Sequence, residues 1–554
     1  MQKRKLHLIG NAHLDPAWLW TWREGYAEVK ATFRSALDRM NEFPEFCFTC
    51  AGAAYYSWVG ESDPGMLEEI RERVKEGRWV IAGGWWIQPD CNAPCGESFA
   101  RHSLYGQRLF LEMFGVTAKT GYNVDSFGHN AMLPQILKLS GMDSYVFMRP
   151  GDMEKDLPSL FWWESDDGSR VMAHRLPFSY SLWYEGYEGD PDDPEFRSKP
   201  MIERKLIGTK RLSEKLETDL MAFYGVGNHG GGPTIENLKL LNRLKSDPKW
   251  SDLLVFSSPD LYFKEQDGLG IPVVHSDLLH HAMGCYSANS EIKALNRRAE
   301  HRVLAGEKFA AMAYAMLGLD YPFDVIKKAW TYIMFNQFHD IMGGCCIKEA
   351  SRDAIESFGA SLSISAEVSN LALQKIAWAI DTMGGSQASV DKEKGWMLWE
   401  LEDKGAPLIV FNPLSWPVSA SIQAGLDVSG VTNEKGEPIP IQKVRGQKTN
   451  FSDKWDTLFI GDIPAMGYRV YWINSSAKAA ELLIKSKAEA QGLVLENQFI
   501  RLELDELTGH IKSLKDKKTG LEFIKGHGAV PVSIDESDCD TWAHGKARFS
   551  GETQ

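Results

Sequence analysis

The first 270 residues alternate between short apolar runs and longer amphipathic stretches, and this alternation limits the fold more than any other feature. Residues 5–10 form an apolar run followed by a polar loop, residues 28–42 have helical spacing, and residues 79–83 form another apolar run. Such alternation predicts parallel strands joined by crossover helices. The sheet is open or closed as a barrel, and in both cases the site lies at the carboxyl ends of the strands.

The pattern changes twice further along the chain. Residues 291–317, 325–337 and 350–383 have helical spacing with few glycines or prolines, which predicts a bundle of three helices. After Trp396, short strand-like runs are separated by Asn, Gly and Pro turns, as is typical of a β-sandwich. We therefore expect a multidomain chain with an α/β barrel-like domain at 1–275, a helical bundle contributing to the site at 276–384, and an all-β sandwich region at 385–554.

Composition excludes several classes of function. The chain has 61 basic and 75 acidic residues, which gives a net charge of −14. An acidic surface repels phosphate groups, so we expect no binding to nucleic acid or to anionic membranes. Eight cysteines are too few for a disulfide framework. No secretory leader is visible and no apolar run reaches about 18 residues, so we expect a cytoplasmic protein. The sequence leaves open whether the chain forms a homo-oligomer.

Three polar elements contain residue types that bind metal ions. His13 and Asp15 follow the first apolar run, and alternate residues of an extended segment point the same way. Asp125 ends a strand-like run, and His339 ends an apolar helical stretch. Two imidazoles and two carboxylates suit zinc or a similar divalent ion. Each element also has a structural interpretation, as a polar loop pair, a helix or turn cap, or a buried core histidine. Their separation in sequence leaves open whether they meet.

Three further features carry weaker signals. The glycine-rich residues 225–234 match neither a phosphate-binding loop nor a dinucleotide fingerprint, and indicate close approach of backbone to a ligand. Cys47, Cys50, Cys91 and Cys95 suggest a four-thiolate zinc site, but Cys47 and Cys50 point to opposite faces of a strand-like run. The 19 tryptophans are core residues or flat platforms for the C–H faces of sugar rings.

Taken together, the polar motifs resemble the family 38 glycoside hydrolases, the class II α-mannosidases. The matching segments occur in family order over roughly residues 5–345 and are residues 13–20, 123–129, 284–287, 296–297 and 336–340. The resemblance implies a (β/α)7-barrel-like catalytic domain, a three-helix bundle and C-terminal β-domains. Family members are longer, so we expect a truncated form with an incomplete β-region.

The resemblance also implies a mechanism. It implies one zinc ion, or another divalent ion, bound by His13, Asp15, Asp125 and His339. Asp125 would be the nucleophile of a retaining α-mannosidase, and a carboxylate beside a divalent cation stays ionised at neutral pH. Residues implied in substrate binding are Trp18, Arg149, Tyr286 and Asp340. The expected substrates are oligosaccharides or glycans with terminal α-linked mannose.

The resemblance does not define the general acid. Relatives commonly carry aspartate where this chain has Asn228, and an amide cannot donate a proton as a carboxylic acid does. His229 is the candidate acid/base, because imidazoles exchange protons near neutral pH. A structural histidine, with another carboxylate as the acid, is the alternative. Two other functions fit the same residues: a zinc-dependent polysaccharide deacetylase, and a mannoside-binding protein with little turnover.

Overall fold

The computed structural model describes residues 4–182, 194–279, 281–382, 384, 404–448, 454–474, 488–534, 540–544 and 552–553. The chain divides into two compact units. Unit 1 comprises Met1–Leu304, Pro322–Glu367 and Glu536–Arg548, and unit 2 comprises Ala305–Tyr321, Val368–Asp535 and Phe549–Gln554. Unit 1 therefore contains a short segment from near the end of the chain.

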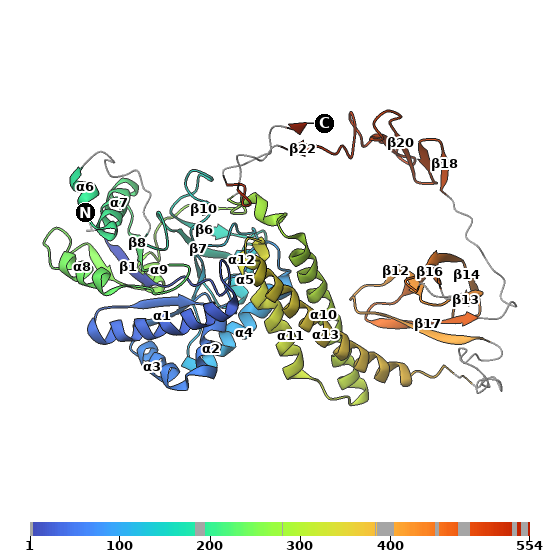
Figure 1. Cartoon of the computed structure of the whole chain (residues 1–554), viewed down its shortest axis with the longest axis horizontal. Coiled ribbons are helices and arrows are strands. Elements are labelled where there is room, and N and C mark those ends of the chain that lie inside the picture. The colour runs from blue at the N-terminus through green and yellow to red at the C-terminus, as the bar shows by residue number, and fades with distance from the viewer. Residues whose placement is uncertain are drawn as a thin grey trace. The chain divides into compact units, whose positions relative to one another are not determined.

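Unit 1 is built on a curled, mainly parallel sheet whose strands alternate with helices (Figure 1). The parallel strands are β1 (Leu6–Asn11), β2 (Phe48–Ala51), β3 (Trp79–Ala82), β4 (Thr120–Asn123), β5 (Ser144–Phe147), β7 (Arg170–Arg175) and β8 (Leu220–Tyr224). They run in the orders β8-β1-β2-β3 and β4-β5-β7. The Gly83 amide donates to the Thr120 carbonyl at 2.8 Å, which joins the end of β3 to β4.

Three shorter strands complete the sheets of unit 1. They are β6 (Leu160–Glu164), β9 (Leu254–Phe256) and β10 (Val273–Val274). Strand β9 pairs with the start of β1, and β6 is antiparallel to β7. Among the described residues, β7 and β8 do not pair, so the curl stays open there. The expected alternation of strands and helices is confirmed. The strands of the expected barrel-like domain form a curled sheet.

Helices follow most of the parallel strands. They are α1 (Trp22–Glu42), α2 (Ala53–Ser62), α3 (Pro64–Lys75), α4 (Gly96–Phe114), α5 (Leu133–Leu139), α6 (Pro194–Ser198), α7 (Met201–Leu216), α8 (Ile235–Lys245) and α9 (Pro259–Glu265). Local sequence sets several of their ends. The Asp63 side chain accepts from the Met66 amide at 3.1 Å and Pro64 begins α3. Gly115 ends α4 in the left-handed conformation, with φ of 72°.

The inside of the curl is filled with apolar side chains from many strands. Ile9, Ala51, Tyr122, Val146 and Phe223 belong to one buried cluster. Their alternate neighbours face the surrounding helices, because successive side chains of a strand point to opposite faces. This packing fixes the carboxyl ends of the strands, and with them the loops that follow.

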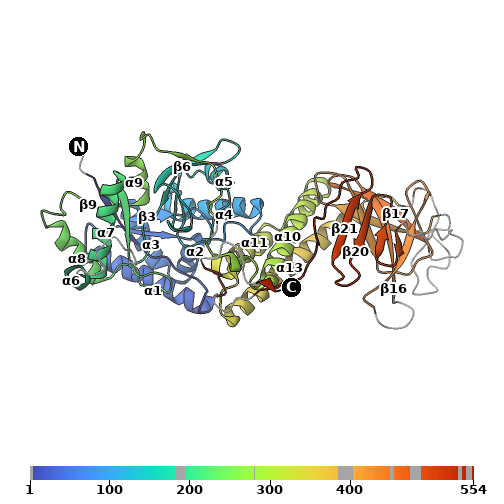
Figure 2. The same cartoon turned by 90° about the horizontal axis from the view of Figure 1, so that it is seen from above.

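The middle of the chain is helical. Its elements are the 3₁₀ helix η1 (Met283–Tyr286), α10 (Ser290–Leu317), α11 (Phe323–Asn336), α12 (His339–Gly343) and α13 (Lys348–Trp378). Figure 2 shows α10, α11 and α13 side by side. The expected long helices are present, and the one expected at residues 325–337 is α11, which ends at Asn336. The backbone leaves helical geometry at Phe338 (φ −49°, ψ 138°), and His339 begins the short helix α12.

Unit 2 contains the sheet-rich C-terminal region. Its strands are β11 (Ala406–Asn412), β12 (Val418–Ala424), β13 (Gly430–Thr432), β14 (Pro438–Ile439), β15 (Ile441–Arg445), β16 (Trp455–Ile463), β17 (Gly467–Asn474), β18 (Glu489–Gln491), β19 (Val494–Glu496), β20 (Ile500–Leu504), β21 (Ile511–Asp516), β22 (Ser533–Ile534) and β23 (Glu552–Thr553). The sheets β11-β17-β13-β14 and β12-β16-β15 share one core that includes Val431, Phe459 and Tyr471. The expected boundary at 384/385 adjoins residues 385–403, which lie outside the described part of the chain. Within the described ranges, no helix has the length and apolar character needed to cross a membrane.

Buried neutral histidines make the stability of unit 1 sensitive to acid. Burial lowers the pKa of His102, His129 and His174 from 6.5 to about 3. The unfolded chain therefore binds protons first as the pH falls from 6.5 to 3, and stability is lost across that window. Each histidine contributes about 1.4 kcal/mol to the change in unfolding free energy per pH unit.

We expect His174→Met to reduce the slope of unfolding free energy against pH, measured with urea and tryptophan fluorescence. His275→Gln, at a 60% exposed side chain, should keep the wild-type slope, and an unchanged slope in His174→Met would contradict the prediction.

Candidate active site

His13 and Asp15 lie in the loop that leaves the carboxyl end of β1. Both side chains are buried, and His13 Nε2 lies 3.0 Å from Asp15 Oδ1. The glycine-rich loop pairs with this segment: the Asn228 amide donates to the His13 carbonyl and the Asp15 amide donates to the Asn228 carbonyl, both at 2.9 Å. The Tyr55 hydroxyl donates to the Leu14 carbonyl at 2.7 Å. These backbone bonds hold the two side chains in place.

Asp125 follows β4 by two residues and is the centre of the cluster. Its Oδ2 lies 3.5 Å from His13 Nε2 and 3.7 Å from His339 Nε2. Arg149, two residues beyond β5, forms an ion pair with Asp125 Oδ1 and donates to the Asp125 carbonyl at 2.7 Å. Burial alone would raise the pKa of Asp125, but Arg149 and the two imidazoles hold it well below its usual range. The carboxylate is therefore ionised.

His339 reaches the cluster from α12. Its Nδ1–H donates to the Gln88 carbonyl at 3.0 Å. This bond selects the tautomer whose Nε2 carries the lone pair, and it orients that nitrogen toward Asp125. Gln88 lies between β3 and α4 and was not among the expected site residues, because a backbone carbonyl leaves no signal in residue type.

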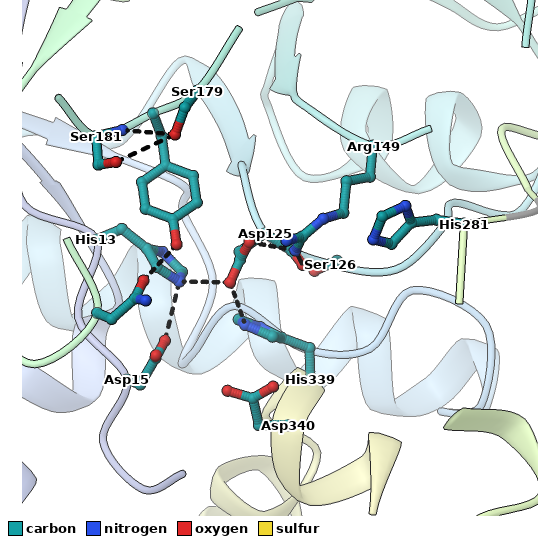
Figure 3. Close-up of polar contacts among 12 residues, drawn as sticks. His13, Asp15, Asp125, Ser126, Arg149, Ser179, Ser181, His281, His339 and Asp340 are labelled. Atoms are coloured by element: carbon teal, nitrogen blue, oxygen red, sulfur yellow. Dashed lines mark hydrogen bonds and ion pairs between the residues drawn. The ribbon is translucent and has the colours of Figure 1, made fainter. Parts of the chain in front are cut away.

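The structure brings His13, Asp15, Asp125 and His339 together, with one ligand atom from each within 4.8 Å of the others (Figure 3). His13 Nε2, Asp15 Oδ1 and His339 Nε2 are buried and face only one another and Asp125, with no hydrogen-bond partner outside the cluster. Buried groups of this kind need a partner, and two imidazole nitrogens with two carboxylates match the donors of a divalent cation. The residues therefore fit a metal ion.

A proton competes with a cation at this cluster. Burial alone would lower the pKa of His13, but Asp15 and Asp125 oppose it and raise the pKa to about 10. Burial and the carboxylates Asp15 and Asp125 raise the pKa of Asp340, which His339 opposes. A cation that replaces the proton on His13 relieves the repulsion among these carboxylates, and its binding releases protons.

The other residues expected to bind substrate differ in burial and in their contacts. Asp340 is 2% exposed and accepts from Cys345 Sγ at 3.1 Å. Trp18 is partly exposed, with its ring centroid 5.9 Å from that of Trp20. Tyr286 is 40% exposed and its hydroxyl accepts from Asn92 Nδ2 at 2.7 Å.

The candidate acid His229 lies outside the four-residue cluster. Its ring is edge-on to Trp20, with centroids 4.5 Å apart, and its Nε2 lies 2.6 Å from Glu24 Oε1. Asn228 places it next to the segment of His13, since the two backbones are hydrogen-bonded. The loop thus places His229 against Trp20 and Glu24, one residue from the backbone pairing with His13.

Tyr180 is a site residue that the sequence patterns did not indicate. Its ring packs on that of His13 with centroids 4.6 Å apart, and its hydroxyl donates to Asn228 Oδ1. Lys205 holds the segment of Tyr180 by donating to the carbonyls of Ser179 and Ser181. No periodicity marks this tyrosine, because it follows β7 in an irregular loop.

Other metal candidates are weaker. His7, Asp219 and Glu265 form a second group, but Lys5 Nζ already pairs with Glu265 Oε2 at 2.7 Å. Within the described ranges, the suggested cysteine quartet forms no metal-binding group. The described cysteines are free thiols, so the four-thiolate interpretation is not supported.

Comparison with known proteins accounts for these motifs. The model "Glycosyl hydrolases family 38 N-terminal domain" matches residues 3–271, and "Alpha mannosidase middle domain" matches residues 280–376. The chain belongs to glycoside hydrolase family 38. These matches cover the curled sheet and the helices that contribute the clustered side chains.

Several family 38 proteins are similar to the chain. It is 26% identical to Alpha-mannosidase G of Dictyostelium discoideum, over 96% of this chain and 48% of that protein. It is 31% identical to human Alpha-mannosidase 2C1, over 63% of this chain and 33% of that protein. The chain thus spans between a third and a half of these relatives. The structure of an alpha-mannosidase from Enterococcus faecalis V583 has the same fold, with a TM-score of 0.71 and 19% identity over 98% of this chain and 64% of that one.

Proposed function

We propose that this family 38 chain is a retaining α-mannosidase that removes terminal α-linked mannose from oligosaccharides or glycans. One observation carries the proposal: an ionised Asp125 lies among two imidazoles, Asp15 and Arg149 at the carboxyl ends of the strands. The names of the similar relatives support mannose as the sugar. A carboxylate that arginine holds ionised is suited to act as a nucleophile at neutral pH.

His13, Asp15, Asp125 and His339 would hold one zinc ion or another divalent ion. When bound, the ion supplies positive charge that orients sugar hydroxyls and keeps the neighbouring carboxylates ionised. Trp18 would form an apolar wall for the ring, and Asp340 and Tyr286 would accept or donate hydrogen bonds to its hydroxyls.

Asp125 would attack the anomeric carbon of the bound mannose. A bond forms between its oxygen and that carbon, while the bond from the carbon to the leaving oxygen breaks and takes its electron pair with it. Arg149 contacts both Asp125 Oδ1 and the Asp125 carbonyl, and these two contacts would hold the carboxylate in one orientation toward the sugar. Water then attacks the same carbon and releases Asp125, and two inversions leave the product as the α anomer.

We propose His229 as the group that protonates the leaving oxygen and later accepts a proton from the attacking water. Its loop is hydrogen-bonded to the segment of His13, and its Nε2 lies 2.6 Å from Glu24 Oε1. For an α-linked mannobiose, whose leaving group needs a proton, we expect His229→Ala to lower kcat/KM by about 10²–10⁴-fold.

A dinitrophenyl α-mannoside tests the same role, because its phenolate leaves without a proton. We expect His229→Ala to change kcat/KM for this substrate by less than about ten-fold. His275→Gln, another histidine paired with a glutamate, should behave as wild type on both substrates. Equal losses on both substrates would show that His229 supports the structure of the loop instead of transferring a proton.

Hydrolysis followed by proton NMR tests the proposed function itself. The expected result is release of α-mannose as the first-formed anomer from an aryl α-mannoside and from mannobiose. First-formed β-mannose would rule out retention. Acetate released from an acetylated polysaccharide without mannose would establish the deacetylase alternative, and tight mannoside binding without hydrolysis would establish a binding protein.

A further inference from the structure

A short C-terminal segment, residues 540–544, lies against the active-site unit. The Gly284 amide donates to the Trp542 carbonyl at 3.1 Å, and Ala282 and His544 form an antiparallel bridge. A Cβ on Gly284 would lie 2.2 Å from the Thr541 carbonyl oxygen, so only glycine permits this approach. The segment is therefore seated by backbone contacts on the turn that precedes α10.

Trp542 extends the aromatic wall of the site. Its ring centroid lies 5.1 Å from that of Phe127 in an edge-to-face arrangement and 6.4 Å from that of Trp18. Phe127 is two residues from Asp125 and lies edge-on to His339, with centroids 5.8 Å apart. Trp542 is only partly buried, so its surface remains available to a ligand beside these rings.

His281 presents an unused polar atom beside the same wall. Its ring is parallel to that of Phe127, with centroids 6.4 Å apart and an interplanar angle of 12°, and it contacts the His544 ring at 5.1 Å. Figure 3 shows it on the far side of Arg149 from Asp125. Its Nδ1 lies 2.7 Å from Glu154 Oε1, whereas Nε2 is buried and has no hydrogen-bond partner.

The contact with Glu154 determines whether His281 Nε2 acts as a hydrogen-bond donor or acceptor. Nδ1–H donates to the carboxylate, so in the neutral ring Nε2 carries a lone pair. Burial lowers the pKa of His281, with Glu154 opposing it, and this favours the neutral form. A buried acceptor without a partner is costly, and a sugar hydroxyl is a donor of the right kind to satisfy it.

We propose that His281 and Trp542 are substrate-specificity residues of this site. Trp542 packs against the sugar, and His281 Nε2 accepts a hydrogen bond from one free hydroxyl of the bound mannoside, with Glu154 fixing the tautomer. The inference rests on the proposed function and adds to it that a mannoside substituted at that hydroxyl is a poor substrate. Residues 540–544 thus take part in recognition although they lie about 200 positions beyond His339 in sequence.

A set of deoxy substrates tests the role of His281. Aryl α-mannosides that each lack one ring hydroxyl are compared with the parent mannoside. For wild type, we expect one of them to lose about ten-fold in kcat/KM, as for one hydrogen bond. In His281→Ala the parent should lose a similar factor, and the same deoxy substrate should lose nothing further. Losses that multiply for every deoxy substrate would overturn the role of His281.

Trp542 is tested with Trp542→Ala and Trp542→Phe. We expect Trp542→Ala to raise KM for the aryl mannoside about ten-fold with little change in kcat, and Trp542→Phe to recover most of the loss. Trp416→Ala, at an exposed tryptophan of unit 2, is the matched control and should resemble wild type. Wild-type KM in Trp542→Ala would overturn the inference alone, whereas wild-type protein that cleaves no mannoside would overturn the proposed function and this inference with it.

Discussion

Replacing Asp125 by asparagine is expected to lower kcat on an aryl α-mannoside by at least roughly 10⁴-fold, because a neutral amide cannot form the covalent bond to the anomeric carbon. The change keeps the volume of the side chain and its contact with Arg149, so the loss reports charge and nucleophilicity. Steady-state hydrolysis measures the effect. Trapping wild type with a fluorinated mannosyl fluoride, followed by peptide mass spectrometry, should place the sugar on Asp125.

Two further variants make the nucleophile test specific. Asp260→Asn makes the same chemical change in a partly buried carboxyl that accepts from Thr120 at the start of β4, and should keep near-wild-type activity. Asp125→Gly with added azide should yield a β-mannosyl azide, because the small anion takes the place of the missing carboxylate. Activity of Asp125→Asn close to that of wild type would exclude Asp125 as the nucleophile.

Removing the metal ion is expected to lower activity by at least about 100-fold, and one equivalent of zinc should restore it. His339→Ala should lower metal affinity by a similar factor, because it deletes one of two neutral nitrogen ligands and leaves two carboxylates beside an unfilled position. Binding also stabilises the folded state, by about 2.7 kcal/mol at a metal concentration 100 times Kd. Thermal unfolding with and without zinc therefore gives a readout independent of activity.

The matched control for His339 is His301→Ala, which removes an exposed histidine from α10. It should bind one zinc ion per chain with wild-type affinity and show the same thermal shift. Full activity after complete chelation, or a wild-type zinc titration of His339→Ala, would show that these four residues do not form the functional metal site.

Local pattern was a reliable guide to the elements of unit 1 and to where its polar residues lie. The apolar run 5–10 corresponds to β1, and the run ending at Asp125 corresponds to β4, because period and length of apolar runs reflect which face of a strand is buried. The polar residues just beyond these runs therefore lie at the carboxyl ends of parallel strands. That rule placed His13, Asp15 and Asp125 at one edge of the sheet, whereas Arg149 was expected only from the family resemblance.

The helix expected at residues 325–337 is confirmed as α11, but periodicity did not show how the backbone continues beyond it. The backbone turns at Phe338, and a new helix begins at His339. Hydrophobic spacing reports burial and not backbone continuity, so it cannot show a break between two buried segments.

Residue types and their order determined the chemistry available to this chain: two histidines and two aspartates beyond predicted strands and helices. Tertiary structure alone decided that these groups meet, that the Gln88 carbonyl selects the tautomer of His339, and that Trp542 and His281 lie beside Phe127. The physical reason is that periodicity is set by contacts a few residues apart. Contacts between loops hundreds of residues apart depend on how whole elements pack, and neither a backbone carbonyl nor a tryptophan in a polar segment signals its distant partner.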